Sequence, residues 1–201
     1  WQSSSGTVVE RNTFLDGARG VSLGLFASEH TGGIVRNNFV RFAPGDLSDV
    51  GIFVASAGAR VLHTTVLLRG NYPYAIEVRW SSTTGVEVRN NLLDGTVFLR
   101  DGASATQSDN LTNAQPEWFV DEASGDLHLD ASATAAIDQV TRLADAVADF
   151  DATDRTSGPG EADIGGDEWV ETAPVPSLSG WAAAMLGALL ICIVGAASRK
   201  G

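Results

Sequence analysis

Short apolar runs separated by glycine, asparagine and aspartate recur along the first 116 residues. Four near-copies of one stretch are VVERNTFLDG from Val8, GIVRNNFVRF from Gly33, RVLHTTVLLRG from Arg60 and VEVRNNLLDG from Val86. Their alignment gives one column at spacings of 25, 27 and 26 residues, occupied by Asn12, Asn37, Thr64 and Asn90. A fixed period in this range is typical of a solenoid, and the runs have strand length with little helical periodicity. The pattern predicts an all-β chain of stacked coils over residues 1–116.

Strand alternation predicts which side chains of each coil point inward. In the second run of each coil these are Val21 and Leu23, Ile52 and Val54, Ile76 and Val78, and Val97 and Leu99. In the first run they are Asn12 and Phe14, Asn37 and Phe39, Thr64 and Val66, and Asn90 and Leu92. Glu10 breaks the alternation, which indicates a local bulge or a shifted register.

The inward asparagines predict a ladder of side-chain amides. Stacked coils bring equivalent side chains to about 4.8 Å, so each amide can donate to the next, and Thr64 can continue the ladder through its hydroxyl. The alternative is an asparagine-rich turn at the surface, where this residue is common. The regular column, with an apolar residue two positions later, favours the ladder.

These repeats resemble the right-handed parallel β-helix proteins of the pectate-lyase-like superfamily, over about residues 6–115. Residues 117–170 are similar to a C-terminal segment called choice-of-anchor Q. The matching positions are Asp138, Asp151, Arg155 and Asp163-Ile164-Gly165, and the departures are Thr134, Ala135 and Gln139. We expect residues 117–170 to form an irregular acidic cap over the last coil, because the open end of a solenoid needs cover.

The C-terminal sequence predicts a membrane anchor. Pro174 and Pro176 indicate an extended linker over residues 171–180. Residues 181–197 are 17 residues without a charge, long enough for a transmembrane helix, and residues 198–201 form a basic cytoplasmic end. A buried core helix is the alternative. The tail also resembles the IPTL-type sorting signals of Gram-negative bacteria. That resemblance implies an exported protein, anchored at the cell surface or released when a sorting protease removes the helix.

Composition narrows the range of functions. The chain begins at Trp1, from which we expect a longer protein with further N-terminal coils. Its formal net charge is −12, and residues 117–171 hold 15 acidic and 2 basic residues, which disfavours nucleic-acid binding. The single cysteine, Cys192, excludes a disulfide within the chain and a cysteine-based zinc site.

The outward column of the second runs is the candidate glycan-binding surface, and its members are Phe53, Glu77, Arg79, Phe98 and Arg100. Arginines can hold the carboxylate of a uronate, and aromatic rings can stack on sugars. The resemblance implies lyase or hydrolase activity on such a face, but the chain has one lysine, Lys200, and no paired-aspartate motif in the coils. Two hypotheses follow: a non-catalytic adhesive or glycan-binding protein, which we favour, or a polysaccharide lyase or hydrolase with catalytic coils partly upstream. Cross-strand stabilisation by these charges is the structural alternative.

Other candidate residues carry weaker signals. Asp149, Asp151 and Asp154 are the candidate calcium ligands, although their spacing departs from an EF-hand loop and a solvated acidic loop is the alternative. Apart from calcium, the sequence predicts no cofactor. His30, His63 and His128 show no ligand spacing. Trp80 and the pair Tyr72 and Tyr74 could bind glycans or cover a turn.

Overall fold

The computed structural model describes residues 4–27 and 29–171. Its strands in the solenoid are β1 (Ser4–Ser5), β2 (Val8–Glu10), β3 (Thr13–Leu15), β4 (Val21–Leu23), β5 (His30–Thr31), β6 (Ile34–Arg36), β7 (Phe39–Arg41), β8 (Ile52–Val54), β9 (Ser56–Ala57), β10 (Arg60–Leu62), β11 (Thr65–Leu67), β12 (Tyr74–Arg79), β13 (Val86–Arg89), β14 (Leu92–Leu93), β15 (Thr96–Arg100) and β16 (Ala105–Ser108). Residues 117–170 add the 3-10 turns η1 (Pro116–Trp118) and η2 (Glu122–Ser124), with β17 (Phe119–Asp121) and β18 (Asp126–Leu129).

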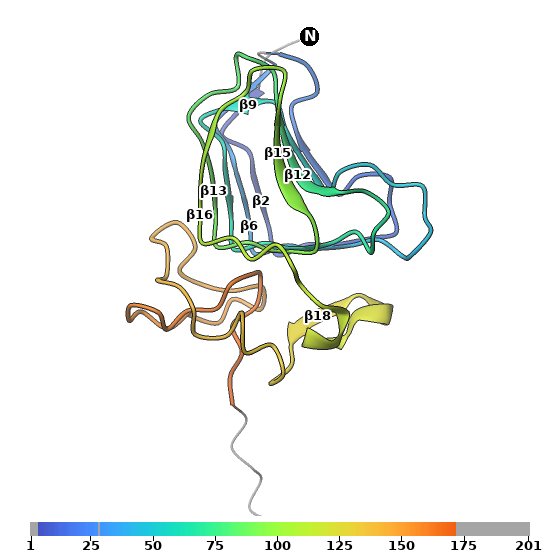
Figure 1. Cartoon of the computed structure of the whole chain (residues 1–201). Coiled ribbons are helices and arrows are strands. Elements are labelled where there is room, and N and C mark those ends of the chain that lie inside the picture. The colour runs from blue at the N-terminus through green and yellow to red at the C-terminus, as the bar shows by residue number, and fades with distance from the viewer. Residues whose placement is uncertain (1–3, 28, 172–201) are drawn as a thin grey trace, which may run out of the picture. The chain divides into compact units, whose positions relative to one another are not determined.

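The solenoid strands form four parallel sheets. Sheet A has the order β1-β5-β9, sheet B β16-β13-β10-β6-β2, sheet C β14-β11-β7-β3 and sheet D β15-β12-β8-β4. Each strand pairs with the strand about one repeat later, as Val35 with Val61 and Val61 with Val88 show. Figure 1 shows the coils one behind another, with sheets B and D on two sides. The described residues contain no α-helix, and this all-β arrangement is consistent with a parallel β-helix.

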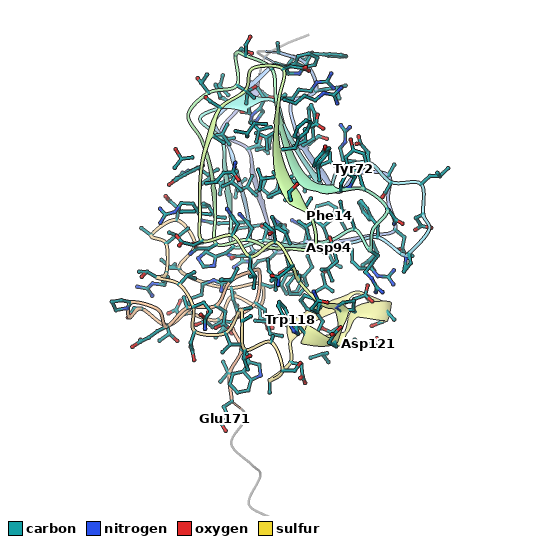
Figure 2. The ribbon with its side chains drawn as sticks, viewed as in Figure 1. Phe14, Tyr72, Asp94, Trp118, Asp121 and Glu171 are labelled. Atoms are coloured by element: carbon teal, nitrogen blue, oxygen red, sulfur yellow. The ribbon has the colours of Figure 1, made fainter. Side chains whose placement is uncertain are left out.

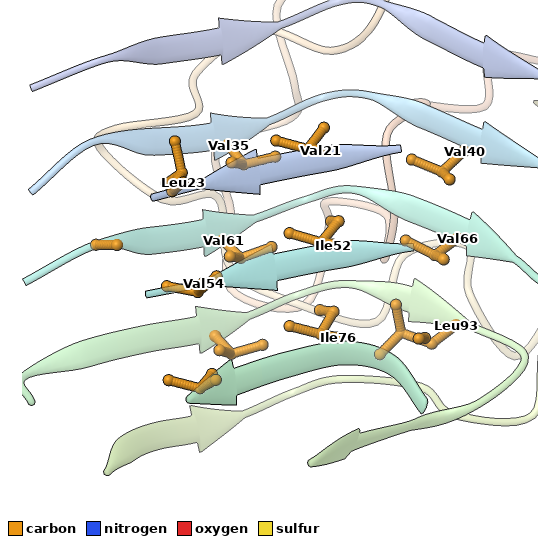
Figure 3. Packing of buried hydrophobic residues seen from close by; sticks show 14 of the residues in the cluster. Val21, Leu23, Val35, Val40, Ile52, Val54, Val61, Val66, Ile76 and Leu93 are labelled. Atoms are coloured by element: carbon orange, nitrogen blue, oxygen red, sulfur yellow. The ribbon is translucent and has the colours of Figure 1, made fainter. Parts of the chain in front are cut away.

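Columns of aliphatic side chains from sheets B, C and D fill the interior (Figure 3). The predicted inward residues of the second runs pack there, from Val21 and Leu23 through Ile76 and Val78. The last predicted pair differs, because Val97 is only partly buried and Leu99 is 37% exposed. Strand β15 is the outermost strand of sheet D, so no further coil covers these two residues.

The predicted register of the first runs is wrong by one residue in two coils. Val40 and Leu93 point into the core, whereas Phe39 and Leu92 pack on the outer side, against residues 117–170. Pairing of Phe14 with Val40, and of Val66 with both Val40 and Leu93, shows the true inward column. Both errors come from the Asn-Asn dipeptides, where either asparagine fits the alignment.

The corner between sheets B and C contains the amide ladder. Side-chain amides bond to each other in two pairs, Asn12 with Asn38 and Asn91 with Asn110. Thr64 occupies the same column between the pairs, but its hydroxyl donates to the Leu62 carbonyl at 3.2 Å and does not continue the ladder as predicted. The Nδ2 group of Asn91 donates to Asn110 Oδ1 at 2.8 Å and to the Val61 carbonyl at 3.0 Å, and Asn91 Oδ1 accepts from the Thr64 amide at 3.0 Å. Asn12 and Thr64 were therefore assigned to the correct column, and Asn37 and Asn90 were not.

Asn37 and Asn90 belong to the preceding position of the turn, which is left-handed in every coil. The residues there are Arg11, Asn37, His63, Asn90 and Asp109, with φ between 42° and 57°. Asparagine and aspartate tolerate this conformation better than most residues, which explains their frequency at the corner. The recurring Asn-Asn pair thus combines a turn residue with a ladder residue.

Residues 117–170, which we call the cap, are irregular as expected, but they lie against the side of the solenoid rather than over its last coil. In Figure 1 this segment lies below the coils, on neither the side formed by sheet B nor the side formed by sheet D. An apolar cluster joins Phe39, Leu67 and Leu92 of the solenoid to cap residues that include Leu127 and Ile164. The cap therefore buries Phe39, Leu67 and Leu92 on the outer face of sheet C.

A buried arginine fixes the cap to the corner turns. Arg155 is fully buried and donates to the Gly165 carbonyl at 2.8 Å, the Asp167 carbonyl at 2.9 Å and Asn37 Oδ1 at 3.2 Å. Gly165 has a φ of 109°, and a Cβ atom there would lie 2.8 Å from Thr65 Oγ1 and 2.9 Å from Leu92 Cβ. Arg155 and Gly165 therefore hold the cap against the solenoid.

The transmembrane helix expected over residues 181–197 and the basic end over 198–201 lie outside the described residues, as does the linker expected over 171–180 except for Glu171. Within the described part of the chain, no helix is long and apolar enough to cross a membrane.

Candidate functional site

The pairing of sheet D brings the five candidate glycan-binding residues together. Glu77 of β12 pairs with Phe53 of β8 and with Phe98 of β15, and Arg79 pairs with Arg100. They come from three successive coils and point outward, because Ile76 and Val78 between them point into the core. Strand pairing therefore places the five side by side on the outer face of sheet D.

Two of the five are not accessible, contrary to the expectation of an exposed column. Phe53 and Glu77 are each only 3% exposed. Phe53 packs in a small cluster with Val50 and Ala55, which Tyr72 and Trp80 partly cover. Figure 2 shows Tyr72 beside β12 on this side of the solenoid. Residues that flank β8 and β12 thus cover the Phe53 ring, and Phe53 cannot stack on a ligand.

The two arginines of the surface have different environments. Arg79 Nε donates to Asp101 Oδ2 at 2.6 Å, and its guanidinium lies 4.2 Å from the centre of the Trp80 ring. The Arg100 guanidinium is 3.8 Å from Glu77 Oε1 and 3.9 Å from Asp101 Oδ2, beyond good hydrogen-bond distance. Its side chain is 43% exposed, against 27% for Arg79. Arg100 is therefore the cation of this surface with donors open to a ligand.

Aromatic rings extend the surface beside Arg100. The rings of Tyr74 and Phe98 are stacked, with centroids 4.2 Å apart, and Tyr72 meets Tyr74 edge to face at 5.5 Å. All three rings are partly exposed. The repeat pattern does not relate Tyr72 and Tyr74 to Phe98, because only the pairing of β12 with β15 brings them together.

The nearest carboxylates, Glu77 and Asp101, both lie within ion-pair distance of Arg79. The surface presents the partly exposed Arg100 guanidinium beside the stacked rings of Tyr74 and Phe98.

The cap places the candidate calcium ligands differently from the prediction. Asp149 is buried and accepts from the Thr153 amide at 2.8 Å, and burial raises the pKa of its carboxyl group. Asp151 lies instead beside His128 and Asp167, whose ligand atoms are all within 4.8 Å of one another. No group containing Asp149 or Asp154 is found among the described residues. No local pattern relates His128 to Asp167, because 39 positions separate them in the sequence.

The other two histidines have structural roles. His30 lies between Ser56 Oγ at 2.8 Å and Thr7 Oγ1 at 2.9 Å, inside the stack of coils. His63 contacts the Asp163 carbonyl at 3.1 Å through Nδ1 and the Asn90 amide at 2.9 Å through Nε2. Burial, followed by the charge of Arg155, lowers the pKa of His63 well below its usual value, so this ring is neutral.

Comparison of the chain with protein-family models, with curated proteins and with solved structures finds no match.

Proposed function

We propose that the chain is part of a right-handed parallel β-helix protein that binds an acidic polysaccharide on sheet D without chemical conversion. The observation that carries this proposal is the Arg100 guanidinium, partly exposed and without a short carboxylate contact, beside the stacked rings of Tyr74 and Phe98. A guanidinium binds a uronate carboxylate or a sulfate through charge-assisted hydrogen bonds, and aromatic faces pack on the apolar faces of sugars.

Arg79 supports this surface rather than binding the ligand. Parallel pairing places it directly beside Arg100, and two guanidinium groups at that spacing repel each other. Glu77 Oε1 reduces the repulsion, since it is 4.0 Å from Arg79 and 3.8 Å from Arg100. Removal of Arg79 would leave Asp101 without its closest cationic partner and the buried Glu77 with Arg100 alone, so Arg79 also stabilises the sheet.

The alternative, a polysaccharide lyase or hydrolase whose catalytic coils lie partly upstream, uses the same surface. Binding is favoured because both carboxylates of the described surface contact Arg79. A lyase needs a base for the α-proton, and a hydrolase needs a protonated acid paired with a second carboxylate. The two functions are separated by whether the complete protein changes the polymer.

We further propose that the protein is exported and displayed at the surface of a Gram-negative bacterium. Support for display comes from the sequence alone: the resemblance to choice-of-anchor Q and IPTL-type segments, and the uncharged run 181–197 before Arg199 and Lys200. A sorting protease that removes this run would release the protein. A solenoid that presents a rigid face to a polymer suits either location.

The test compares binding of polygalacturonate and of a neutral polysaccharide to the full chain, to Arg100→Ala and to Arg11→Ala. Arg11 is the matched control, because its side chain is 42% exposed and lies on another corner of the solenoid. We expect Arg100→Ala to weaken polygalacturonate binding about tenfold or more, the usual contribution of a charge-assisted hydrogen bond, and Arg11→Ala to have little effect.

Equal affinity of the two variants would refute the assigned surface. Unsaturated sugar products or new reducing ends, produced by the complete protein and lost in Arg100→Ala, would replace the binding function with the enzymatic one.

A further inference from the structure

The cap contains a cluster of ligand-type side chains that is separate from the sheet D surface. His128 of β18, Asp151 and Asp167 come from three segments of the cap, and one ligand atom of each lies within 4.8 Å of the others. His128 Nε2 is 3.1 Å from Asp151 Oδ2. These three side chains are distant in the sequence, and their proximity is a feature of the folded cap.

The imidazole of His128 is held in one orientation. Its Nδ1 atom is 2.5 Å from Asp126 Oδ1, so Nε2 is the atom left to face Asp151. The ring also packs edge-on against Phe39 of the solenoid at 5.2 Å and Phe150 at 5.6 Å. A carboxylate on the far nitrogen, with the ring fixed by packing, is the usual support of a metal-bound histidine.

Asp167 gives independent evidence that a cation belongs here. This residue is only 5% exposed, and one of its oxygens accepts from the Leu129 amide at 2.7 Å. Among the described residues it forms no ion pair within 4.0 Å, although a buried carboxylate is normally paired or bound to a metal.

We propose that His128, Asp151 and Asp167 bind a divalent transition-metal ion, with zinc as the best-matched ion and Asp126 as the group that orients His128. Ligand atoms at about 2.0–2.2 Å from zinc in a tetrahedron lie about 3.3–3.6 Å apart. His128 Nε2 and Asp151 Oδ2 are 3.1 Å apart, and no two of the three ligand atoms are more than 4.8 Å apart. Small side-chain movements would therefore bring the three atoms to the spacing that zinc requires. One nitrogen and two oxygen ligands suit zinc better than calcium, which prefers oxygen alone.

The charge balance also favours an ion over a protonated histidine. Three carboxylates, Asp126, Asp151 and Asp167, surround one imidazole. A proton supplies one positive charge, whereas a divalent ion supplies two and also draws Asp167 into direct contact. The metal also links strands and loops of the cap that share little regular structure.

The experiment titrates Zn²⁺ into the full chain by calorimetry, in a Cys192→Ser background that removes the one thiol. We expect one zinc ion per chain and a higher melting temperature with zinc. Asp151→Asn and His128→Gln should each weaken binding at least about tenfold. Asp154→Asn, an exposed acidic residue three positions from Asp151, is the matched control and should bind zinc normally.

Asp151 is exposed, with 57% of its side chain accessible, so Asp151→Asn is expected to fold and carries the test if His128→Gln does not. Melting of both variants in chelator shows whether each is folded. No stoichiometric zinc binding, tighter binding of Ca²⁺ than of Zn²⁺, or zinc binding equal in Asp151→Asn and Asp154→Asn would each overturn the proposal.

Discussion

Replacing Asn91 by leucine tests the amide ladder at its best-connected rung. The side chain is fully buried and makes three hydrogen bonds, to the Thr64 amide, the Val61 carbonyl and Asn110 Oδ1. Leucine has a similar size, so the main loss is polar. Three net hydrogen bonds contribute about 3 kcal/mol, and the stranded amide and carbonyl groups raise the expected destabilisation to about 3–5 kcal/mol.

The control is the same substitution at Asn12, an exposed rung of the same ladder. Its Nδ2 group donates to Asn38 Oδ1 at 3.1 Å and to the Glu10 carbonyl at 2.8 Å, and water can replace both bonds. We expect Asn12→Leu to cost about 1 kcal/mol. Urea unfolding of the full chain, followed by tryptophan fluorescence, gives the difference in the free energy of unfolding.

Asn90→Leu distinguishes the two possible columns. Asn90 Nδ2 contacts His63 Nε2 at 2.9 Å and the Thr141 carbonyl at 3.2 Å, so its loss weakens the contact between turn and cap. Equal costs for Asn91→Leu and Asn12→Leu would refute the ladder as a stabilising element. A larger cost for Asn90→Leu than for Asn91→Leu would place the ladder in the column first inferred from the repeats.

Two further predictions concern the cap and the tail. Gly165→Ala should destabilise the protein by about 2–4 kcal/mol, because the new Cβ atom would collide with Thr65 and Leu92. The control is Gly160→Ala, which is also at positive φ but makes no close contact. It should cost about 1 kcal/mol in the same urea assay. Deletion of residues 175–201 should release a soluble, folded protein from membranes, measured by fractionation and circular dichroism; an aggregated product would mean that the tail belongs to the core.

The sequence predicted the coils well because burial on one face imposes a period of two within each strand and a fixed period between coils. It misplaced two ladder residues because the Asn-Asn pairs satisfy both the turn and the ladder positions. At Arg11-Asn12 and His63-Thr64 only one residue can fill the ladder, and there the assignment was correct.

The accessibility of the candidate surfaces could not be predicted from local pattern. Phe53 and Glu77 were correctly assigned to the outer face of sheet D, but residues around Tyr72 fold over them. His128 and Asp167 come together only because the cap doubles back on itself along sheet C. These contacts depend on how long loops pack, and a repeat pattern contains no information about that packing.

The side-on position of the cap changes how a pulling force would travel through the molecule. Glu122 of the cap pairs with Arg41 of one coil and with Arg69 of the next. The Gly165 amide donates to the Asn90 carbonyl of a third coil. Tension applied at the C-terminal end of the cap therefore enters three coils in parallel. A cap seated over the last coil would instead concentrate the force on one set of strand hydrogen bonds, which would peel apart one at a time.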